Sequence, residues 1–253
     1  MAEAILSRLL AQQVFAANSV LVSEPRASRR DYLSQEYGVE VTADNQTAIS
    51  TTKILLLAIK PQIFDLVTAD LNVPPNITVI SILAGITITR LETAFPQQPV
   101  IRVMPNTPAT VGVGISAIAL GTKAQAEHLT QAKSIFEAVG EVVEVSETAM
   151  DAVTGLSGSG PAFVALAIEA LADGGVAAGL PRAIALQLAT QTVLGTATLV
   201  KETGKHPGVL KDQVTSPGGT TIAGVAKLES LGFRSALIEA VKTASERSRE
   251  LGQ

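Results

Sequence analysis

The chain has 253 residues, a formal net charge of −4 and no cysteine, which leaves room for two modest domains and excludes disulfides, thiolate nucleophiles and cysteine-based metal sites. A hydrophobic fraction of 47% and a charged fraction of 17% are typical of a globular protein. The acidic balance offers no positive field for nucleic acid, and the two histidines, His128 and His206, are far apart in sequence. We therefore expect neither a nucleic-acid partner nor a metal site.

Short apolar runs alternate with helical patterns over the first 148 residues. We expect strands at 19–23, 39–41, 53–59, 78–82, 100–104, 115–120 and 141–145, and helices at 1–13, 26–36, 62–71, 87–94 and 123–139. This alternation predicts an α/β domain with a parallel, doubly wound sheet, typical of dinucleotide binding. The single G-x-G-x-x-A match, which includes Gly112 and Gly114, runs into an expected strand, so we interpret it as an ordinary loop.

The second part of the chain, residues 149–253, is expected to be all helical. Helices are predicted at 152–178, 182–203, 222–231 and 233–250. The first two are rich in Ala, Gly and Thr and apolar on several faces, so they require cover on several sides. The uncharged stretch 183–200 is just long enough to cross a membrane, but its glutamines and threonines favour a buried helix in a soluble core or subunit interface, with no membrane contact.

One glycine-rich bend, between two predicted helices of this second part, is a candidate binding site. Pro217 suits a turn, and Gly218 and Gly219 allow a ligand to approach bare backbone just before a helix begins. Free N–H groups at a helix start, together with the helix dipole, attract an anion. The pattern predicts a small carboxylate site, and the alternative is an ordinary capped loop. The site would comprise Ser216, Gly218, Gly219, Thr220 and Thr221.

Five runs spread over the whole chain together resemble pyrroline-5-carboxylate reductases. They are LAIKPQ at 57–62, SILAGITI at 81–88, RVMPNTPA at 102–109, DAVTGLSGSGPAF at 151–163 and HPGVLKDQVTSPGGTTIAG at 206–224. The resemblance implies a Rossmann-type domain over 1–148 and a helical dimerisation and substrate domain over 149–253. It also implies a cytoplasmic homodimer or larger homo-oligomer that reduces 1-pyrroline-5-carboxylate to L-proline with NAD(P)H, the last step of proline biosynthesis.

The resemblance has one departure, at the start of the sequence. Family members carry a first strand and a G-x-G-x-M-A-like turn just before the segment that matches residues 1–4. Without them the cofactor pyrophosphate lacks its cradle and the sheet lacks a central strand. We therefore expect this chain to bind cofactor poorly or to fold marginally, and a strand and turn placed before Met1 to restore activity. Glu3 and Arg8, inside the first apolar run, argue against a signal peptide.

The resemblance also assigns roles in the bend. Thr221 would be catalytic, with its hydroxyl beside the substrate ring nitrogen, although a helix-capping role is the alternative. Ser216 and the backbone of residues 219–221 would hold the substrate carboxylate. His206 is expected to fix the turn beside it. Lys211 and Asp212 are expected to be charges on a helix face, with a minor role in the substrate loop as the alternative.

For the cofactor, the resemblance points to residues that follow the predicted strands. Arginines just after the strand expected at 19–23 suit a 2′-phosphate, whereas Glu24 suits a ribose hydroxyl, so we favour NADPH and keep NADH open. Lys60 as a solvated lysine and Asn45 as a turn residue are the alternatives. The expected cofactor-binding residues are Ser23, Arg26, Asn45, Ala58, Ile59, Lys60, Pro61, Ala84, Gly85, Pro105 and Asn106, with Arg29 and Arg30 near the phosphate.

Two other functions compete with this interpretation. A related two-domain hydroxyacid dehydrogenase needs a basic lysine on the first helix of its helical domain, and the stretch from Ala152 to Asp173 contains none. A cofactor-impaired chain that acts only as a helical dimerisation protein is the non-enzymatic alternative, which NADPH binding would distinguish from an enzyme.

Overall fold

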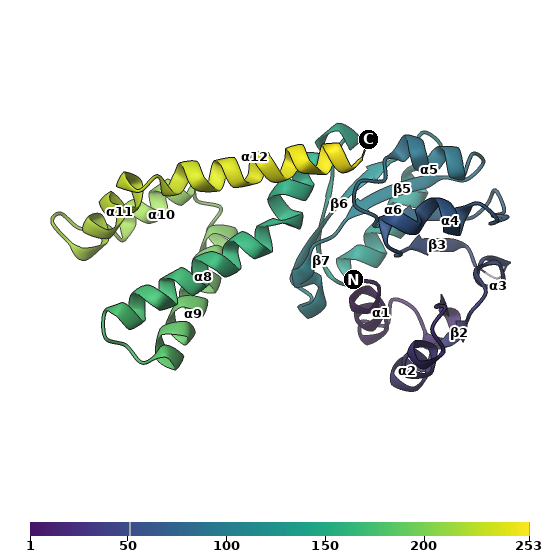
Figure 1. Cartoon of the computed structure of the whole chain (residues 1–253), viewed down its shortest axis with the longest axis horizontal. Helices are drawn as coiled ribbons and strands as arrows, with labels where there is room; N and C mark the ends of the chain where they lie inside the picture. The colour runs from purple at the N-terminus through teal and green to yellow at the C-terminus, as the bar shows by residue number, and fades with distance from the viewer. Residues whose placement is uncertain (51, 253) are drawn as a thin grey trace. The chain divides into compact units, whose positions relative to one another are not determined.

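The computed structural model describes residues 1–50 and 52–252. Two compact units form (Figure 1). Unit 1 comprises Met1–Ser159 together with Thr243–Gln253, and unit 2 comprises Gly160–Lys242. The chain therefore leaves unit 1, builds unit 2 and returns to unit 1 near its end.

Unit 1 contains a five-stranded sheet with the order β3-β4-β5-β6-β7 (Figure 1). Its strands are β3 (Ile54–Leu57), β4 (Thr78–Ser81), β5 (Val100–Met104), β6 (Gly114–Leu120) and β7 (Gly140–Glu144). All neighbouring pairs are parallel except β5 and β6, which are antiparallel. The prediction of an entirely parallel sheet is therefore wrong at this pair. Only residues 105–113 connect β5 to β6, fewer than the dozen or so that a parallel crossover requires.

The inner strands β4 and β5 of the five-stranded sheet are buried on both faces. Ile80 and Ile101 belong to one apolar cluster, whereas their chain neighbours Val79 and Val100 belong to a second. Because successive side chains of a strand point to opposite faces, these clusters are two separate cores. The helices of unit 1 are α1 (Ala2–Ala11), α2 (Ala27–Tyr37), α3 (Asn45–Ser50), α4 (Phe64–Thr68), α5 (Ile88–Ala94), α6 (Ala126–Glu137) and α7 (Met150–Val153). This is the doubly wound arrangement that the alternating pattern predicts.

The first two strands form a separate parallel sheet of their own. They are β1 (Leu21–Ser23) and β2 (Glu40–Thr42). Within the described residues, β1 pairs only with β2, and β3 pairs only with β4. Helix α1 packs on both sheets. Its residue Leu6 belongs to the apolar cluster of the small sheet, and Ile5 belongs to one of the two clusters of the large sheet. Both sheets thus share a covering helix, while β1 and β3 each keep one unpaired edge.

Unit 2 is helical. Its helices are α8 (Gly160–Ala177), α9 (Arg182–Thr203), α10 (Pro207–Gln213), α11 (Thr220–Ser230) and the first part of α12 (Phe233–Leu251), which continues into unit 1. Helices α8 and α9 form a hairpin around a small core of Ala172, Ala185 and Ala189. A π-helical turn, Thr154–Gly158, precedes α8 in unit 1. The sequence predicted α8, α9, α11 and α12 but missed the short helices α3 and α10.

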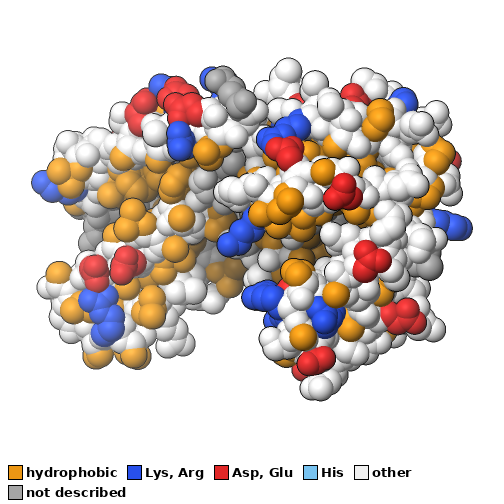
Figure 2. Space-filling view, turned by 45° about the vertical axis from the view of Figure 1, so that its right-hand side comes forward, with side chains coloured by type: hydrophobic (Ala, Val, Ile, Leu, Met, Phe, Trp, Pro, Cys, Tyr) orange, Lys and Arg blue, Asp and Glu red, His pale blue; other side chains and the backbone are white. Residues whose placement is uncertain are grey.

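Much of the apolar surface of unit 2 is uncovered in the single chain, and exposed hydrophobic side chains are visible among the charged ones in Figure 2. Two stretches of the described chain, Glu147–Ala177 and Arg182–Thr203, are long and apolar enough to cross a membrane by length and composition alone. Only 6% and 11% of their most apolar windows is buried. The exposed large side chains on α8 and α9 are Val164, Leu166, Leu171, Ile184, Leu186, Leu188, Leu194 and Leu199. The single chain leaves most of α9 uncovered, so of the two predicted settings the core of the chain is not the one found, and the subunit interface stays a prediction.

Candidate functional site

Three of the predicted cofactor segments lie at the end of the large sheet where the carboxyl termini of its neighbouring strands meet. Strands β3, β4 and β5 are parallel neighbours, so the residues that follow their carboxyl ends lie at the same end of the sheet. In a doubly wound sheet, dinucleotides bind at this carboxyl-terminal end of the strands. The structure thus brings together, within unit 1, the segments that contain Ala58, Ile59, Lys60, Pro61, Ala84, Gly85, Pro105 and Asn106.

Local contacts fix the shape of these three segments. Gly85 has a φ of +76°, a conformation that glycine adopts without strain. Asn106 accepts a hydrogen bond from the N–H of Ile115 through its Oδ1 atom, at 3.0 Å, so its side chain also holds the loop before β6. Lys60 is exposed and directly precedes Pro61, the first residue of a short 3₁₀ turn. This end of the sheet therefore carries the turn at Gly85, the 3₁₀ turn at Pro61 and the exposed cation of Lys60.

The small sheet carries a second group of predicted cofactor residues. The Oγ of Ser23, at the end of β1, donates a hydrogen bond to Oδ1 of Asn45 at 2.6 Å. Asp44 accepts from the backbone N–H groups of Gln46 and Thr47, which caps the first turn of α3. The structure therefore places Ser23 and Asn45 side by side, as two polar groups at the carboxyl end of β1.

The arginines near this pair are already engaged. The Nε of Arg26 contacts Oε1 of Glu24 at 2.9 Å, and this hydrogen bond lowers the pKa of the Glu24 carboxyl. The side chain of Arg26 is 72% exposed. Arg29 pairs with Glu3, and Arg30 donates to the backbone carbonyls of Glu24 and Pro25. Arg26 is therefore the arginine of this group that remains accessible to an anion from solvent, although Glu24 competes for it.

The glycine-rich bend lies in unit 2, between α10 and α11. Gly218 has a φ of +66°, and Gly219 is the N-cap of α11. A side chain at Gly219 would clash with Oγ of Ser216, so the hydroxyl sits against the bare backbone. No side chain caps α11, which leaves N–H groups of its first turn free of a side-chain partner. Most of the bend is exposed and Thr221 is half-buried, so donors and hydroxyls face outward together, as an anion site requires.

The structure confirms the predictions for three residues that flank the bend. Nδ1 of His206 accepts the N–H of Gly208 at 3.1 Å, so this imidazole caps α10 and fixes the turn. Lys211 and Asp212 pair with each other on the surface of α10. None of these side chains contacts the glycines of the bend, consistent with supporting roles.

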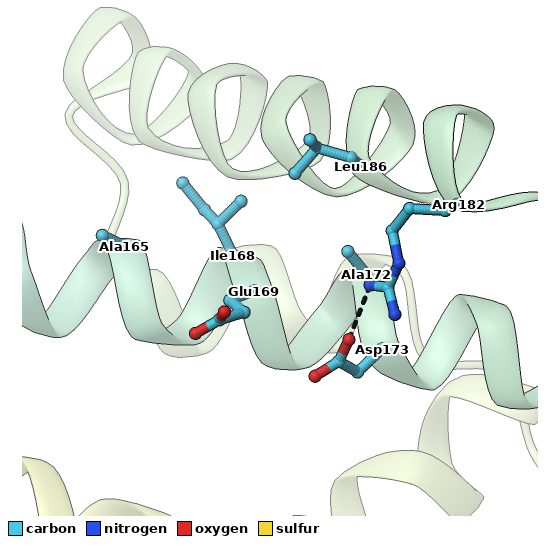
Figure 3. A pocket seen from close by; sticks show the side chains of 7 residues that line it. All are labelled: Ala165, Ile168, Glu169, Ala172, Asp173, Arg182 and Leu186. Atoms are coloured by element: carbon cyan, nitrogen blue, oxygen red, sulfur yellow. Dashed lines mark ion pairs between the residues drawn. The ribbon is translucent and has the colours of Figure 1, made fainter.

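A pocket between α8 and α9 is a poor candidate for the site (Figure 3). Its lining residues are Ala165, Ile168, Glu169, Ala172, Asp173, Arg182 and Leu186. Arg182 and Asp173 point toward each other and form an ion pair of 2.6 Å at one end. None of the predicted catalytic or substrate residues lines this pocket, so it belongs to the uncovered helical surface.

Comparisons with known proteins identify the family. Residues 147–251 match the family model "pyrroline-5-carboxylate reductase dimerisation", and residues 1–85 match "NADP oxidoreductase coenzyme F420-dependent". A pyrroline-5-carboxylate reductase from Synechocystis is 61% identical over 254 residues, which cover 100% of this chain and 95% of that protein. The chain belongs to the pyrroline-5-carboxylate reductase family.

Solved structures agree with this membership. A pyrroline-5-carboxylate reductase from Coxiella burnetii superposes with a TM-score of 0.92 at 32% identity, over 100% of this chain and 95% of that one. The Plasmodium falciparum reductase, solved with NADP bound, gives 0.86 at 29% identity, over 99% and 94%. They confirm the predicted fold class, a Rossmann-like domain followed by a helical dimerisation domain. As a member of this family the chain is an oxidoreductase of proline biosynthesis that uses a nicotinamide cofactor.

One part-buried ion pair of this chain was not predicted from the sequence. Arg102, on β5, is 5% exposed and donates from Nη1 to Oε1 of Glu147 at 3.1 Å. The same oxygen accepts the N–H of Ile88, the first residue of α5. The pair thus ties β5, α5 and the segment before α7 together. A charged residue within an apolar strand was a usable signal for it, since buried arginines are nearly always paired.

Proposed function

We propose that the chain reduces 1-pyrroline-5-carboxylate to L-proline with NADPH, and that the Ser216–Thr221 bend holds the substrate carboxylate. The observation that carries the assignment of the bend is the helix start after Gly218 and Gly219, which no side chain caps. Substrate contacts come from the hydroxyl of Ser216 and the backbone N–H groups of Thr220 and Thr221, because the N–H of Gly219 already donates to the carbonyl of Ser216 at 3.1 Å. A carboxylate is the anion that this group of donors suits, because it needs several hydrogen bonds and no metal.

The reaction adds a hydride to the carbon of the C=N bond and leaves a proton on the nitrogen, so a ring imine becomes the ring amine of proline. The nicotinamide supplies the hydride when bound, because no side chain provides one. An imine that binds already protonated needs no acid from the protein. Its N–H donates to the hydroxyl of Thr221, which orients the ring while the bend fixes the carboxylate.

Two parts of unit 1 fit a nicotinamide dinucleotide. The exposed residue Ala84, with Lys60 and Asn106, offers backbone and polar groups at the strand ends, where we place the nicotinamide half, while the buried Gly85 shapes the turn. The Ser23–Asn45 pair suits the ribose at the other end. A strand-to-helix G-x-G turn for the pyrophosphate is not found in the part of the chain described here.

The preference for NADPH over NADH rests on Arg26. Its exposed guanidinium lies at the N-cap of α2, beyond the end of β1, where a 2′-phosphate would accept hydrogen bonds from it. Glu24 binds the same guanidinium and so weakens the preference without removing the cation. Arg29 is held by Glu3, and Arg30 by backbone carbonyls, so neither is the main phosphate ligand.

We further propose that the chain works as a homodimer or larger homo-oligomer in the cytoplasm. The region that matches the dimerisation family carries the uncovered apolar side chains of α8 and α9, and a second copy is the natural cover for them. Residues 1–148 then serve dinucleotide binding, and residues 149–253 serve dimerisation and substrate binding. A second copy over α8 and α9 would also explain why these two helices are so apolar, without any contact with a membrane.

An assay of NADPH oxidation with 1-pyrroline-5-carboxylate tests the proposal. Thr221→Ala is expected to lower kcat about ten- to hundredfold with unchanged NADPH binding, whereas Thr221→Ser keeps the hydroxyl and most of the activity. Gly219→Ala pushes the hydroxyl of Ser216 aside and is expected to raise the KM for the substrate about tenfold.

Unchanged turnover in Thr221→Ala would remove Thr221 from the mechanism. A wild-type chain that binds no NADPH in a fluorescence titration, yet still forms dimers, would instead support the non-enzymatic alternative. Circular dichroism of each variant serves as the folding control.

A further inference from the structure

Within unit 1, the last part of α12 is joined to α7 by a part-buried hydrogen bond. Ser248 is 5% exposed, and its Oγ donates to Oδ1 of Asp151 at 2.7 Å. Asp151 lies on α7, so residues 97 positions apart in sequence are joined. A hydroxyl-to-carboxylate bond is stronger than a neutral one, and its burial makes loss of either partner costly.

Two glycines meet just beyond this attachment. A Cβ added to Gly252 would lie 3.1 Å from the carbonyl oxygen of Gly85, and one added to Gly85 would lie 3.3 Å from the carbonyl oxygen of Leu251. Both distances are tighter than most Cβ contacts in proteins, so the end of α12 packs backbone to backbone against the Gly85 turn. Gly85 is itself buried, with its positive φ.

The turn that α12 contacts is otherwise held by the buried side chains of Leu83 and Ile86 and by a hydrogen bond from the N–H of Leu83 to Oγ of Ser81. Its internal hydrogen bond, from the N–H of Ile86 to the carbonyl of Leu83, is long at 3.4 Å. Ala84, which follows the carboxyl end of β4, is exposed. The same turn lies beside Lys60 and Asn106 at the carboxyl ends of β3 and β5, where the nicotinamide half is placed. The position of the end of α12 therefore sets the position of a cofactor-binding turn.

We infer that Ser248 and Asp151 are positioning residues for the coenzyme, which fix the end of α12 against the Ala84–Gly85 turn and so set the nicotinamide subsite. This inference rests on the proposed function, because it takes Ala84 and Gly85 as cofactor contacts. The pair acts through the turn and touches no reacting atom. Its loss allows the helix end to shift and the turn to sample conformations that do not bind coenzyme, which weakens coenzyme binding while the substrate bend of unit 2 is unchanged.

The test compares Ser248→Ala with two matched variants. Ser245→Ala makes the same change three residues earlier on α12, at a hydroxyl without a hydrogen-bond partner among the described residues. Gln98→Ala removes another buried side-chain hydrogen bond of unit 1, to the carbonyl of Val73, near the amino end of β5. We expect Ser248→Ala to raise the Kd and the KM for NADPH about fivefold, with the KM for 1-pyrroline-5-carboxylate unchanged, and both controls to keep wild-type NADPH affinity.

Variants of Asp151 separate positioning from general stability. Asp151→Asn keeps an oxygen acceptor and is expected to bind NADPH nearly as the wild type does, whereas Asp151→Ala should match Ser248→Ala. The double variant Ser248→Ala/Asp151→Ala should bind NADPH as tightly as either single variant, because each single substitution already removes the same hydrogen bond. Gly252→Ala, which presses on Gly85, should also weaken NADPH binding.

An NADPH affinity of Ser248→Ala equal to that of Ser245→Ala overturns the inference, as does a loss of affinity in Gln98→Ala of the same size, since stability alone would then explain both. A wild-type chain without NADPH binding overturns the proposed function together with the inference. Wild-type binding with an insensitive Ser248→Ala overturns the inference alone.

Discussion

At the scale of single residues, the proposed preference for NADPH depends on one guanidinium, that of Arg26. Arg26 is bound by Glu24 through its Nε atom, and the N–H of Arg26 also donates to Oε1 of Glu24 at 3.1 Å. The other arginines of the region are committed to Glu3 or to backbone carbonyls. Any discrimination between the two coenzymes is therefore a competition between a phosphate and the carboxylate of Glu24.

Substitutions at these two residues are expected to act in opposite directions. Arg26→Ala should weaken NADPH binding about tenfold and leave NADH nearly unaffected, because it removes a charge-assisted contact to a phosphate that NADH lacks. Glu24→Gln should strengthen NADPH binding, since the guanidinium is then released from its carboxylate. The two KM values, measured with each coenzyme, check both. Equal losses for the two coenzymes in Arg26→Ala would place Arg26 away from the phosphate.

A second residue-scale network links α1 to α2. The carboxylate of Glu3 accepts hydrogen bonds from Arg29, from the Tyr37 hydroxyl at 2.9 Å and from the Tyr32 hydroxyl at 3.1 Å. The hydrogen bond from Arg29 is the main cause of a lowered pKa at Glu3, opposed by partial burial. Burial and the bond to Glu3 raise the pKa of Tyr37.

The lowered pKa makes the stability of unit 1 sensitive to acid. A carboxyl with a lower pKa when folded contributes stability above its unfolded pKa and loses it as the pH falls through the folded value. Glu3→Gln should cost less than about 1 kcal/mol at neutral pH, because Glu3 is partly exposed, and should flatten the fall in stability below about pH 5. Urea unfolding at several pH values measures this. Parallel curves for variant and wild type would contradict it.

At the scale of elements, the unpaired edges of β1 and β3 are the unusual feature of the fold. Both strands belong to unit 1, and α1 packs on both sheets. Edge strands present free N–H and C=O groups, which one further strand between them would satisfy on both sides. Such a strand, followed by a glycine-rich turn, is also what the pyrophosphate of a dinucleotide requires.

A segment with a short apolar strand and a G-x-G turn, added before Met1, should therefore increase the stability of unit 1 and tighten NADPH binding at least about tenfold. A control segment of the same length with Pro in the strand cannot pair on both edges and should do neither. Melting temperature and fluorescence titration check the two effects. Full activity of the 253-residue chain without any addition would contradict the need for the strand.

The elements also show how far the sequence leads. The apolar pattern predicted the seven strands of the described residues. The pattern is clearest in β4 and β5, because strands buried on both faces are nearly continuous in hydrophobic residues. The direction of β6 was missed, although the short β5–β6 connection carried that information. Helices α3 and α10 were missed because each buries a single side chain, Ile49 or Leu210, and so carries no apolar stripe.

In the candidate site, the sequence located the glycine bend and the strand ends, because each depends on local chemistry of a few neighbouring residues. It did not reveal that Arg29 is engaged by Glu3, or that Ser248 reaches Asp151 and Arg102 reaches Glu147. Such pairs join residues distant in sequence, so they depend on tertiary packing that no local pattern encodes. The site roles themselves stay predictions until the variants are measured.

At the scale of the whole molecule, the helical hairpin of unit 2 buries too little by itself. Helix α9 has 22 residues, of which Ala185 and Ala189 are the buried ones. Leu188 is 53% exposed and Leu194 is 58% exposed. Large apolar side chains uncovered in such number are typical of an interface between copies of a chain.

The double substitution Leu188→Glu/Leu194→Glu should convert the oligomer to monomers, because buried carboxylates without partners oppose association. Leu66→Glu, on α4 of unit 1, changes a leucine that is 79% exposed and should leave the oligomer intact. Light scattering after gel filtration gives the mass of each. An unchanged mass for the double variant would place the subunit interface elsewhere.

The chain's departure from unit 1 and later return affects its biosynthesis. A ribosome makes Met1–Ser159 first and Thr243–Gln253 only after the whole of Gly160–Lys242. The nascent nucleotide-binding portion consequently emerges without the segment that carries Ser248, and it waits for translation of the helical portion before it acquires its last native contacts. A translation product stalled after Ser159 would therefore be more susceptible to protease than the same residues within the released protein.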